Sequence, residues 1–298
     1  MGNKKHFRIF GWVLLIVICS VIALTGILGY KGLLNFSFMA IKGDGNIITK
    51  NYSVKDINTF EIDRMNLTGD GVKITFISGD EEGITVETDS NLINDEFTAN
   101  YSDSKRFKLS GTWFKRYSPS IMNVTVTAKS LKQISIGGSA VVKYDNITTD
   151  TVFGFSGKVK ANLKFSVTDL KINVSGSADI NVEGIAENFS LNCSGSASLT
   201  GTNLMLTDCS LKSSGSSEID FSGNCDIFTV KTSGSSDISG KGFNCREVTL
   251  EASGSSDMTI SVSEKLKADV SGIADIVYYG NPSVEKESSG SCSIKKGD

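Results

Sequence analysis

Carboxylates that recur at one position of a repeat are the side chains in this sequence best suited to chemistry. Each lies three residues after a recurrent glycine: Asp179, Glu218, Asp237, Asp257 and Asp275. Where repeats stack, equivalent side chains lie about 4.8 Å apart, so these carboxylates would repel one another or bind a cation such as calcium. Calcium takes roughly six to eight oxygen ligands, and one carboxylate per repeat falls short of that number. We therefore interpret the series as a solvated turn edge, with a calcium site as the alternative.

Catalytic chemistry has few other residues to use. The only histidine is His6, so a histidine base or a His-rich zinc site has nothing further along the chain. From Leu131 onward the single arginine is Arg246, and we find neither a second acidic series nor an aromatic platform for a sugar. The net charge of -3, with no excess of basic residues, argues against a nucleic-acid partner. We expect no catalytic residue, no cofactor and no metal ion, apart from the calcium alternative.

Two cysteines occupy equivalent places in neighbouring repeats. Cys225 and Cys245 each lie nine residues before the next recurrent glycine, so they should stack in adjacent coils, at a separation that a disulfide can span. We prefer to interpret them as small core thiols, and a disulfide is the alternative. Five cysteines follow Cys19, and an odd number cannot pair completely within one chain.

An aromatic and basic cluster lies in the first half of the chain. It consists of Trp113, Phe114 and Tyr117 with Lys115 and Arg116. We interpret it as a loop edge that packs on the rest of the molecule or faces a bilayer. A patch that contacts sugar or lipid is the alternative.

An uncharged apolar run over residues 9–30 predicts a membrane anchor. At about 1.5 Å per residue, a helix of this length crosses a hydrocarbon core of roughly 30 Å. Lys4, Lys5 and Arg8 precede the run, so the positive-inside rule puts the N-terminus in the cytoplasm. A cleaved signal peptide is the alternative, although its apolar region is usually about 7–15 residues. We predict a single-pass protein with everything from Lys31 onward outside.

The second half of the chain repeats itself. The recurrent glycines are Gly138, Gly157, Gly176, Gly195, Gly215, Gly234, Gly254, Gly272 and Gly290, at spacings of 18 to 20 residues. Copies such as VSGSADI, SSGSSEI and TSGSSDI surround them. A fixed period in this range is typical of a solenoid.

The hydrophobic alternation within each repeat has a period of two, which predicts strands. Before Gly176, for example, Leu170, Ile172 and Val174 alternate with polar residues. After it, Ala178 and Ile180 are separated by Asp179, so we expect two or three short strands per repeat. Such a unit cannot bury its own apolar face, and stacked units bury it against each other. The sequence therefore predicts an all-β, single-stranded parallel β-helix with coils of about 19 residues, in which Ile219 is buried.

Four segments follow from these patterns. Residues 1–30 are the cytoplasmic tail and transmembrane anchor, and 31–50 are a membrane-proximal connector. Residues 51–130 contain less regular alternating runs, which we interpret as irregular first coils or a cap. Residues 131–298 are the regular repeats, and Lys286 occupies the last copy of an apolar position, as expected of a polar terminal coil.

Three longer stretches resemble a known family. GDGNIITKNYSVKDINTFEID, GVKITFISGDEEGITVETDSNL and SLKQISIGGSAVV lead into the SGSAD copies. Together they are similar to the GIN-domain family, described as "putative auto-transporter adhesin, head GIN domain", and to the related DUF4097-type bacterial β-helix proteins. The resemblance covers about residues 43–298. It implies a right-handed parallel β-helix on a bacterial envelope and offers no catalytic motif. Many members have a conventional signal or lipobox in place of the long anchor.

With the anchor, this resemblance predicts a protein of the bacterial cytoplasmic membrane. We expect a non-catalytic binding or adhesion module for an extended partner, which is a glycan, a cell-wall polymer or an envelope protein. An accessory protein of envelope-stress signalling is the alternative, and a carbohydrate-active enzyme is a third.

Overall fold

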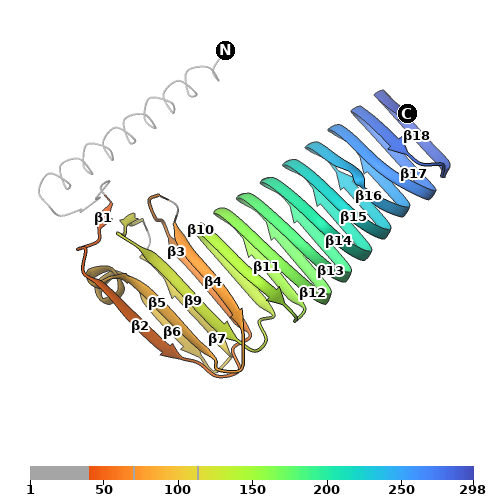
Figure 1. Ribbon diagram of the computed structural model, residues 1–298. Coiled ribbons are helices and arrows are strands. Elements are labelled where there is room, and N and C mark those ends of the chain that lie inside the picture. The colour runs from red at the N-terminus through yellow and green to blue at the C-terminus, as the bar shows by residue number, and fades with distance from the viewer. Residues whose placement is uncertain (1–39, 70, 113) are drawn as a thin grey trace, which may run out of the picture. The chain divides into compact units, whose positions relative to one another are not determined.

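The computed structural model describes residues 40–69, 71–112 and 114–298, apart from the side chain of Arg64 (Figure 1). The expected anchor over residues 9–30 and the start of the expected connector lie outside the described residues. In the ranges that are described, no helix has the length and apolar character needed to cross a bilayer.

Residues from Gln133 onward form a parallel solenoid (Figure 1). The regular coils are β12 (Lys158–Val174), β13 (Ser177–Cys193), β14 (Ser196–Ser213), β15 (Ser216–Thr232) and β16 (Ser235–Ala252). They are preceded by β10 (Gln133–Ile147) and β11 (Thr151–Phe155) and followed by β17 (Ser255–Tyr279) and β18 (Ser283–Lys296). Each coil pairs in parallel with the next. The predicted all-β solenoid with coils about 19 residues apart is confirmed, and it has about nine turns. The expectation of two or three short strands per repeat is wrong for the regular coils, because each forms one continuous strand.

The inward side chains form one continuous core. Leu170, Ile172 and Val174 are at most 2% exposed, as the alternation predicts, and Ile219 is 1% exposed. Aromatic rings on adjacent coils contact one another in this core, and the Phe221 and Phe243 ring centroids lie 5.4 Å apart. Stacking equivalent apolar residues on adjacent coils thus buries the face that a single repeat would leave in water.

The corner glycines are required by close approach between coils. A Cβ atom on Gly195 would lie 2.0 Å from the carbonyl oxygen of Gly176 in the adjacent coil. Among the corner glycines, positive φ occurs only near the two ends of the series, at Gly138, Gly272 and Gly290. In the middle coils the glycine is therefore selected by space rather than by an unusual backbone conformation.

A cap of shorter strands precedes the solenoid (Figure 1). Its elements are β1 (Ile41–Lys42), β2 (Ile47–Ser53), β3 (Thr59–Met65), β4 (Val72–Ser78), β5 (Gly83–Asp89), the π-helix η1 (Leu92–Glu96), β6 (Thr98–Ser102), β7 (Arg106–Ser110), β8 (Tyr117–Ser118) and β9 (Met122–Ala128). Strands β3 and β4 stack in parallel on β10, whereas β2, β5 and β9 form antiparallel pairs. Residues 41–50, assigned above to the connector, contain β1 and the start of β2.

Candidate functional site

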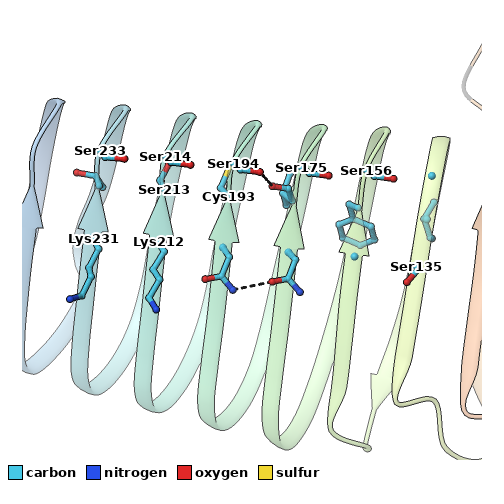
Figure 2. A pocket seen from close by; sticks show the side chains of 18 of the residues that line it. Ser135, Ser156, Ser175, Cys193, Ser194, Lys212, Ser213, Ser214, Lys231 and Ser233 are labelled. Carbon is cyan, nitrogen blue, oxygen red and sulfur yellow. Dashed lines mark hydrogen bonds between the residues drawn. The ribbon is translucent and has the colours of Figure 1, made fainter.

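A polar groove of about 870 Å³ runs along the solenoid beside the corner glycines (Figure 2). The period-2 alternation turns the residues one and three positions before each glycine outward, and the residue between them inward. The first position gives a serine column: Ser156, Ser175, Ser194, Ser214, Ser233, Ser253 and Ser271. The second gives an outer column: Glu61, Ser135, Gly154, Asn173, Asn192, Lys212, Lys231, Glu251 and Asp269. The groove crosses nine coils in register, which is about 40 Å along the rod.

Several polar groups of the outer column are paired between adjacent coils. Asn192 Nδ2 donates to Asn173 Oδ1 at 3.0 Å, which links adjacent coils (Figure 2). Lys231 Nζ lies 2.7 Å from a carboxylate oxygen of Glu251 in the next coil. At the cap end, Lys108 Nζ lies 3.0 Å from Glu61 Oε1. The column is therefore a partial hydrogen-bonded ladder, in which the paired side chains are held in place before any partner arrives.

The groove floor consists of buried positions. Val174, Cys193, Thr232 and Ala252 line it and are at most 4% exposed. Ser213 occupies the same position in β14 and is 4% exposed. In the described part of the chain, Ser213 Oγ is a buried side-chain oxygen with no hydrogen-bond partner. An unsatisfied buried hydroxyl costs about 1–3 kcal/mol, so this coil is the least satisfied part of the groove.

The acidic series predicted from the sequence lies on the opposite side of the same corner. Glu218, Asp237 and Asp257 are register partners in successive coils and are exposed. Ser198 separates them from Asp179, and Lys295 Nζ lies 3.4 Å from Asp275 Oδ2. Asp179, Glu218, Asp237 and Asp257, together with the serines of the corner, line a second groove of about 630 Å³, which Asp275 does not reach. Among the described residues, no group of three or more His, Cys, Asp or Glu is placed to hold a metal ion.

The cysteine pair is in register, as predicted. Cys225 and Cys245 are direct partners in β15 and β16, and both are free thiols that are at most 5% exposed. A hydrogen bond with Cys225, together with burial, raises the pKa of the Cys245 thiol far above its ordinary value. Burial likewise raises the pKa of Cys209, with a smaller contribution from Cys225. Protonated, buried thiols are poor nucleophiles, so the geometry gives them a packing role.

The aromatic and basic cluster does not form one surface. Phe114 is 92% exposed, whereas Tyr117 is fully buried with its ring centroid 4.9 Å from that of Phe97. Lys115 Nζ lies 2.9 Å from Glu96 Oε2, and this hydrogen bond raises the pKa of Lys115. Trp113 lies outside the described residues.

Sequence reasoning missed the polar groove, although its signal was present. From sequence alone, the serine before each glycine is explained by its capacity to bond the turn backbone. The residues three positions before the glycine were set aside as the polar half of an alternating pattern. Counting outward positions on both sides of the corner would have found two polar columns beside a glycine row.

The fold and this surface define a class of protein, a capped β-solenoid with a shallow polar groove. The family model described as "Putative auto-transporter adhesin, head GIN domain" (DUF2807) matches residues 67–222 and 206–282. These matches span more than half of the chain, so the chain belongs to this family. A search of the curated proteins found no match.

Solved structures share the fold. A structure described as a putative adhesin from Parabacteroides merdae ATCC 43184 matches with a TM-score of 0.67 and 20% identity, over 87% of this chain and 99% of its own. A putative lipid binding protein from Parabacteroides distasonis ATCC 8503 gives a TM-score of 0.62 and 20% identity, over 87% and 100%. A putative adhesin from the same organism gives a TM-score of 0.53 and 22% identity, over 87% of this chain and 100% of its own. At these identities the likeness shows the fold alone.

Proposed function

We propose that this protein is a non-catalytic adhesion module whose groove binds an extended partner, which is a glycan, a cell-wall polymer or an envelope protein. In this proposal, residues 9–30 hold it in the bacterial cytoplasmic membrane with the N-terminus inside and the solenoid outside. The observation that carries the proposal is the continuous groove, which crosses nine coils without closing into a pocket. The family and two adhesin-like structural neighbours support it.

The shape of the groove favours a long partner over a small one. Small-molecule sites are usually concave, largely apolar and bury most of the ligand. Here the apolar residues of the floor are buried, and the accessible side chains of the lining are serine, asparagine and charged residues. A ladder held by its own hydrogen bonds loses little conformational freedom on contact, so weak contacts can add along the rod. Several anchored copies on one membrane would strengthen binding further.

The arrangement of the carboxylates supports a non-catalytic role. Glycoside hydrolysis needs two carboxyl groups that flank the scissile bond. In the groove, Glu251 and Asp269 are neighbours in one column and project from the same wall. At their level the facing wall is the serine column. The other two carboxylates of the lining, Glu61 and Asp63, lie at the cap end, where both are paired with Lys108.

Binding to arrayed protein tests the adhesion proposal. The full chain is incorporated into liposomes at low and high density and presented with bacterial wall fragments. We expect weak retention at low density, with dissociation constants of roughly micromolar or worse, and clearly stronger retention at high density. Ser194→Trp, which fills the groove with a bulky side chain, should abolish retention. Tight one-to-one binding of a small metabolite in calorimetry would contradict the proposal.

A fusion experiment tests the anchor separately. Alkaline phosphatase attached after residue 298 is active only when it is exported, so we expect an active fusion. A fusion in which Lys4, Lys5 and Arg8 are all replaced by Glu should lose orientation and activity, because the positive-inside signal is gone. An inactive fusion of the natural sequence would overturn the exported location.

A further inference from the structure

The middle of the groove carries one lysine that the ladder leaves unpaired. The groove contains two lysines, Lys212 and Lys231, which are register partners in β14 and β15. Lys231 pairs with Glu251, whereas Lys212 has no hydrogen bond or ion pair within the described residues (Figure 2). Its neighbour on the other side, Asn192, donates one amide hydrogen to Asn173. Lys212 is therefore a positive charge beside hydroxyl and amide groups, with no internal anion.

The coil that contains Lys212 also contains the unsatisfied floor hydroxyl. Ser213 follows Lys212 in the chain, and both line the groove. Its oxygen is buried without a partner among the described residues, although the equivalent Thr232 Oγ1 lies 3.0 Å from Ser256 Oγ. An unpaired cation and an unused hydroxyl thus occur at the same level of the rod. These are two separate observations, because the Lys212 side chain faces outward and the Ser213 side chain faces inward.

The direction of the strands limits what kind of partner can bind. The strands run across the groove, and their backbone groups bond to the coils on either side. A peptide lying in the groove therefore finds no free strand edge to extend, which removes the usual basis of strand addition. The apolar residues of the floor are at most 5% exposed, so the groove also lacks a pocket for the aromatic anchors of a protein interface. Hydrogen bonds to serine and asparagine remain, together with the Lys212 charge.

From these features we infer that the central four coils of the groove bind a linear, hydroxyl-rich polymer that carries negative charges. Its carboxylate or phosphate group lies opposite Lys212, and its hydroxyls bond Asn173, Asn192 and the adjacent serines. The site from Asn173 to Lys231 extends about 14 Å, which holds a few sugar units. Asp269 lies beyond one end, where its charge would repel a continuing anionic chain. At the cap end, Glu61 and Asp63 are both paired with Lys108 and set no such limit. This inference rests on the proposed function and names the class of its partner.

Retention on defined polymers tests the inference. The full chain in detergent is passed over beads that carry polygalacturonate, poly(glycerol phosphate) or neutral dextran of similar length. We expect retention on one or both anionic polymers, release by salt, and little retention on dextran. The two anionic arms distinguish a carboxylate from a phosphate partner. Lys212→Glu should weaken retention about tenfold, since it replaces an attraction by a repulsion of similar size.

A matched variant separates the groove from general surface charge. Lys171 is exposed on the same coil face, two residues before Asn173, and does not line the groove. Lys171→Glu makes the same change of charge and should alter retention by less than about twofold. Melting temperatures of both variants should match that of the natural chain, because both side chains are exposed.

The outcomes distinguish the inference from the proposed function. Equal retention of the Lys212→Glu and natural chains on anionic beads would overturn the inference. So would dextran retention as strong as that on the anionic beads. If Ser194→Trp still abolishes that dextran retention, the groove binds an extended partner and the proposed function stands. No retention on any polymer, together with no density-dependent binding to wall fragments, would overturn both.

Discussion

The α-carbon of Gly195 faces the carbonyl oxygen of Gly176 so closely that a Cβ atom on Gly195 would lie 2.0 Å from that oxygen. The same contact recurs up the corner, with 1.9 Å for Gly215 on Gly195 and 2.0 Å for Gly234 on Gly215. Real Cβ contacts with backbone are never this short, and backbone in a stacked coil cannot move aside alone. The row of glycines therefore fixes how tightly the coils pack beside the groove.

Replacing one corner glycine should be costly. Gly195→Ala forces the two coils apart, so we expect a loss of about 1–3 kcal/mol in the free energy of unfolding, as for other overpacked sites. Ser196→Ala, which changes the exposed neighbouring residue, should cost less than about 0.5 kcal/mol. Urea unfolding followed by circular dichroism measures both. Equal stability of the two variants would show that the corner can relax.

A buried position and its exposed counterpart should respond very differently to substitution. Ile219 is 1% exposed between Leu199 and Ile238, so Ile219→Lys places a charge in a dry stack. We expect a loss of several kcal/mol, on the order of 3–5. Asp237→Asn changes an exposed side chain and should cost less than about 1 kcal/mol. Thermal melting of both variants checks that Ile219 faces the core and Asp237 faces solvent. Similar losses of melting temperature for the two variants would contradict this assignment.

Acid should weaken the cap through Asp89. Burial alone would raise the pKa of Asp89, but hydrogen bonds from Ser120 and Gly45 outweigh it and hold the pKa below its ordinary value. Because the pKa of Asp89 is lower in the folded protein than in the unfolded chain, its ionised carboxylate stabilises the fold at pH values above the unfolded pKa of about 4. That stabilisation is lost as the pH falls through the pKa of Asp89 in the folded protein.

Asp89→Asn gives the matching test. The amide leaves a donor facing the donors of Ser120 and Gly45, so we expect a loss of about 1–3 kcal/mol at neutral pH. The free energy of unfolding of the variant should also change less than that of the natural chain between pH 5 and 2. Parallel pH curves for the two proteins would exclude Asp89 as the titrating group.

How much could be read from the sequence differs between the solenoid and the cap. Period-2 alternation and the glycine period place Leu170, Ile219 and the Cys225–Cys245 register correctly, because each repeat meets only copies of itself. In the cap, β5 lies between β2 and β9, and nothing in the alternating runs specifies those antiparallel partners. The same limit applies to the groove. Lys212 and Asn192 are visible in the sequence, but which of them is already satisfied depends on side-chain reach between coils.

Calcium should not stabilise the acidic series. Each of Glu218, Asp237 and Asp257 supplies one exposed carboxylate, and a bound ion would need roughly six to eight oxygens. We expect the melting temperature to stay within about 1 °C when millimolar calcium is added. A clear rise that disappears in the Asp237→Asn, Asp257→Asn double variant would instead establish a cation site.

The open end of the solenoid should associate once its lysine is removed. Strand β18 pairs with β17 on one side, and no described strand covers its other edge. Lys286 takes the place that Ala268 and Leu250 occupy in the two preceding coils, and its Nζ donates to the carbonyl oxygen of Ile294 at 3.4 Å. The charge thus lies over the end of the core, where it opposes the stacking of a second chain. Inward charges of this kind are a general protection for exposed sheet edges.

Lys286→Val removes that charge and leaves an apolar end beside Val284, which is 38% exposed. We expect weak end-to-end association of the full chain in detergent, with a dissociation constant of about 10–100 μM, because one coil buries less than the roughly 800 Å² per partner of a stable interface. Lys267→Val makes the same change at an exposed outward position of β17 and should remain monomeric. Sedimentation velocity over a range of concentrations separates the two variants. If Lys286→Val sediments as the natural chain does at every concentration, the unpaired edge of β18 is protected by its backbone geometry rather than by the lysine.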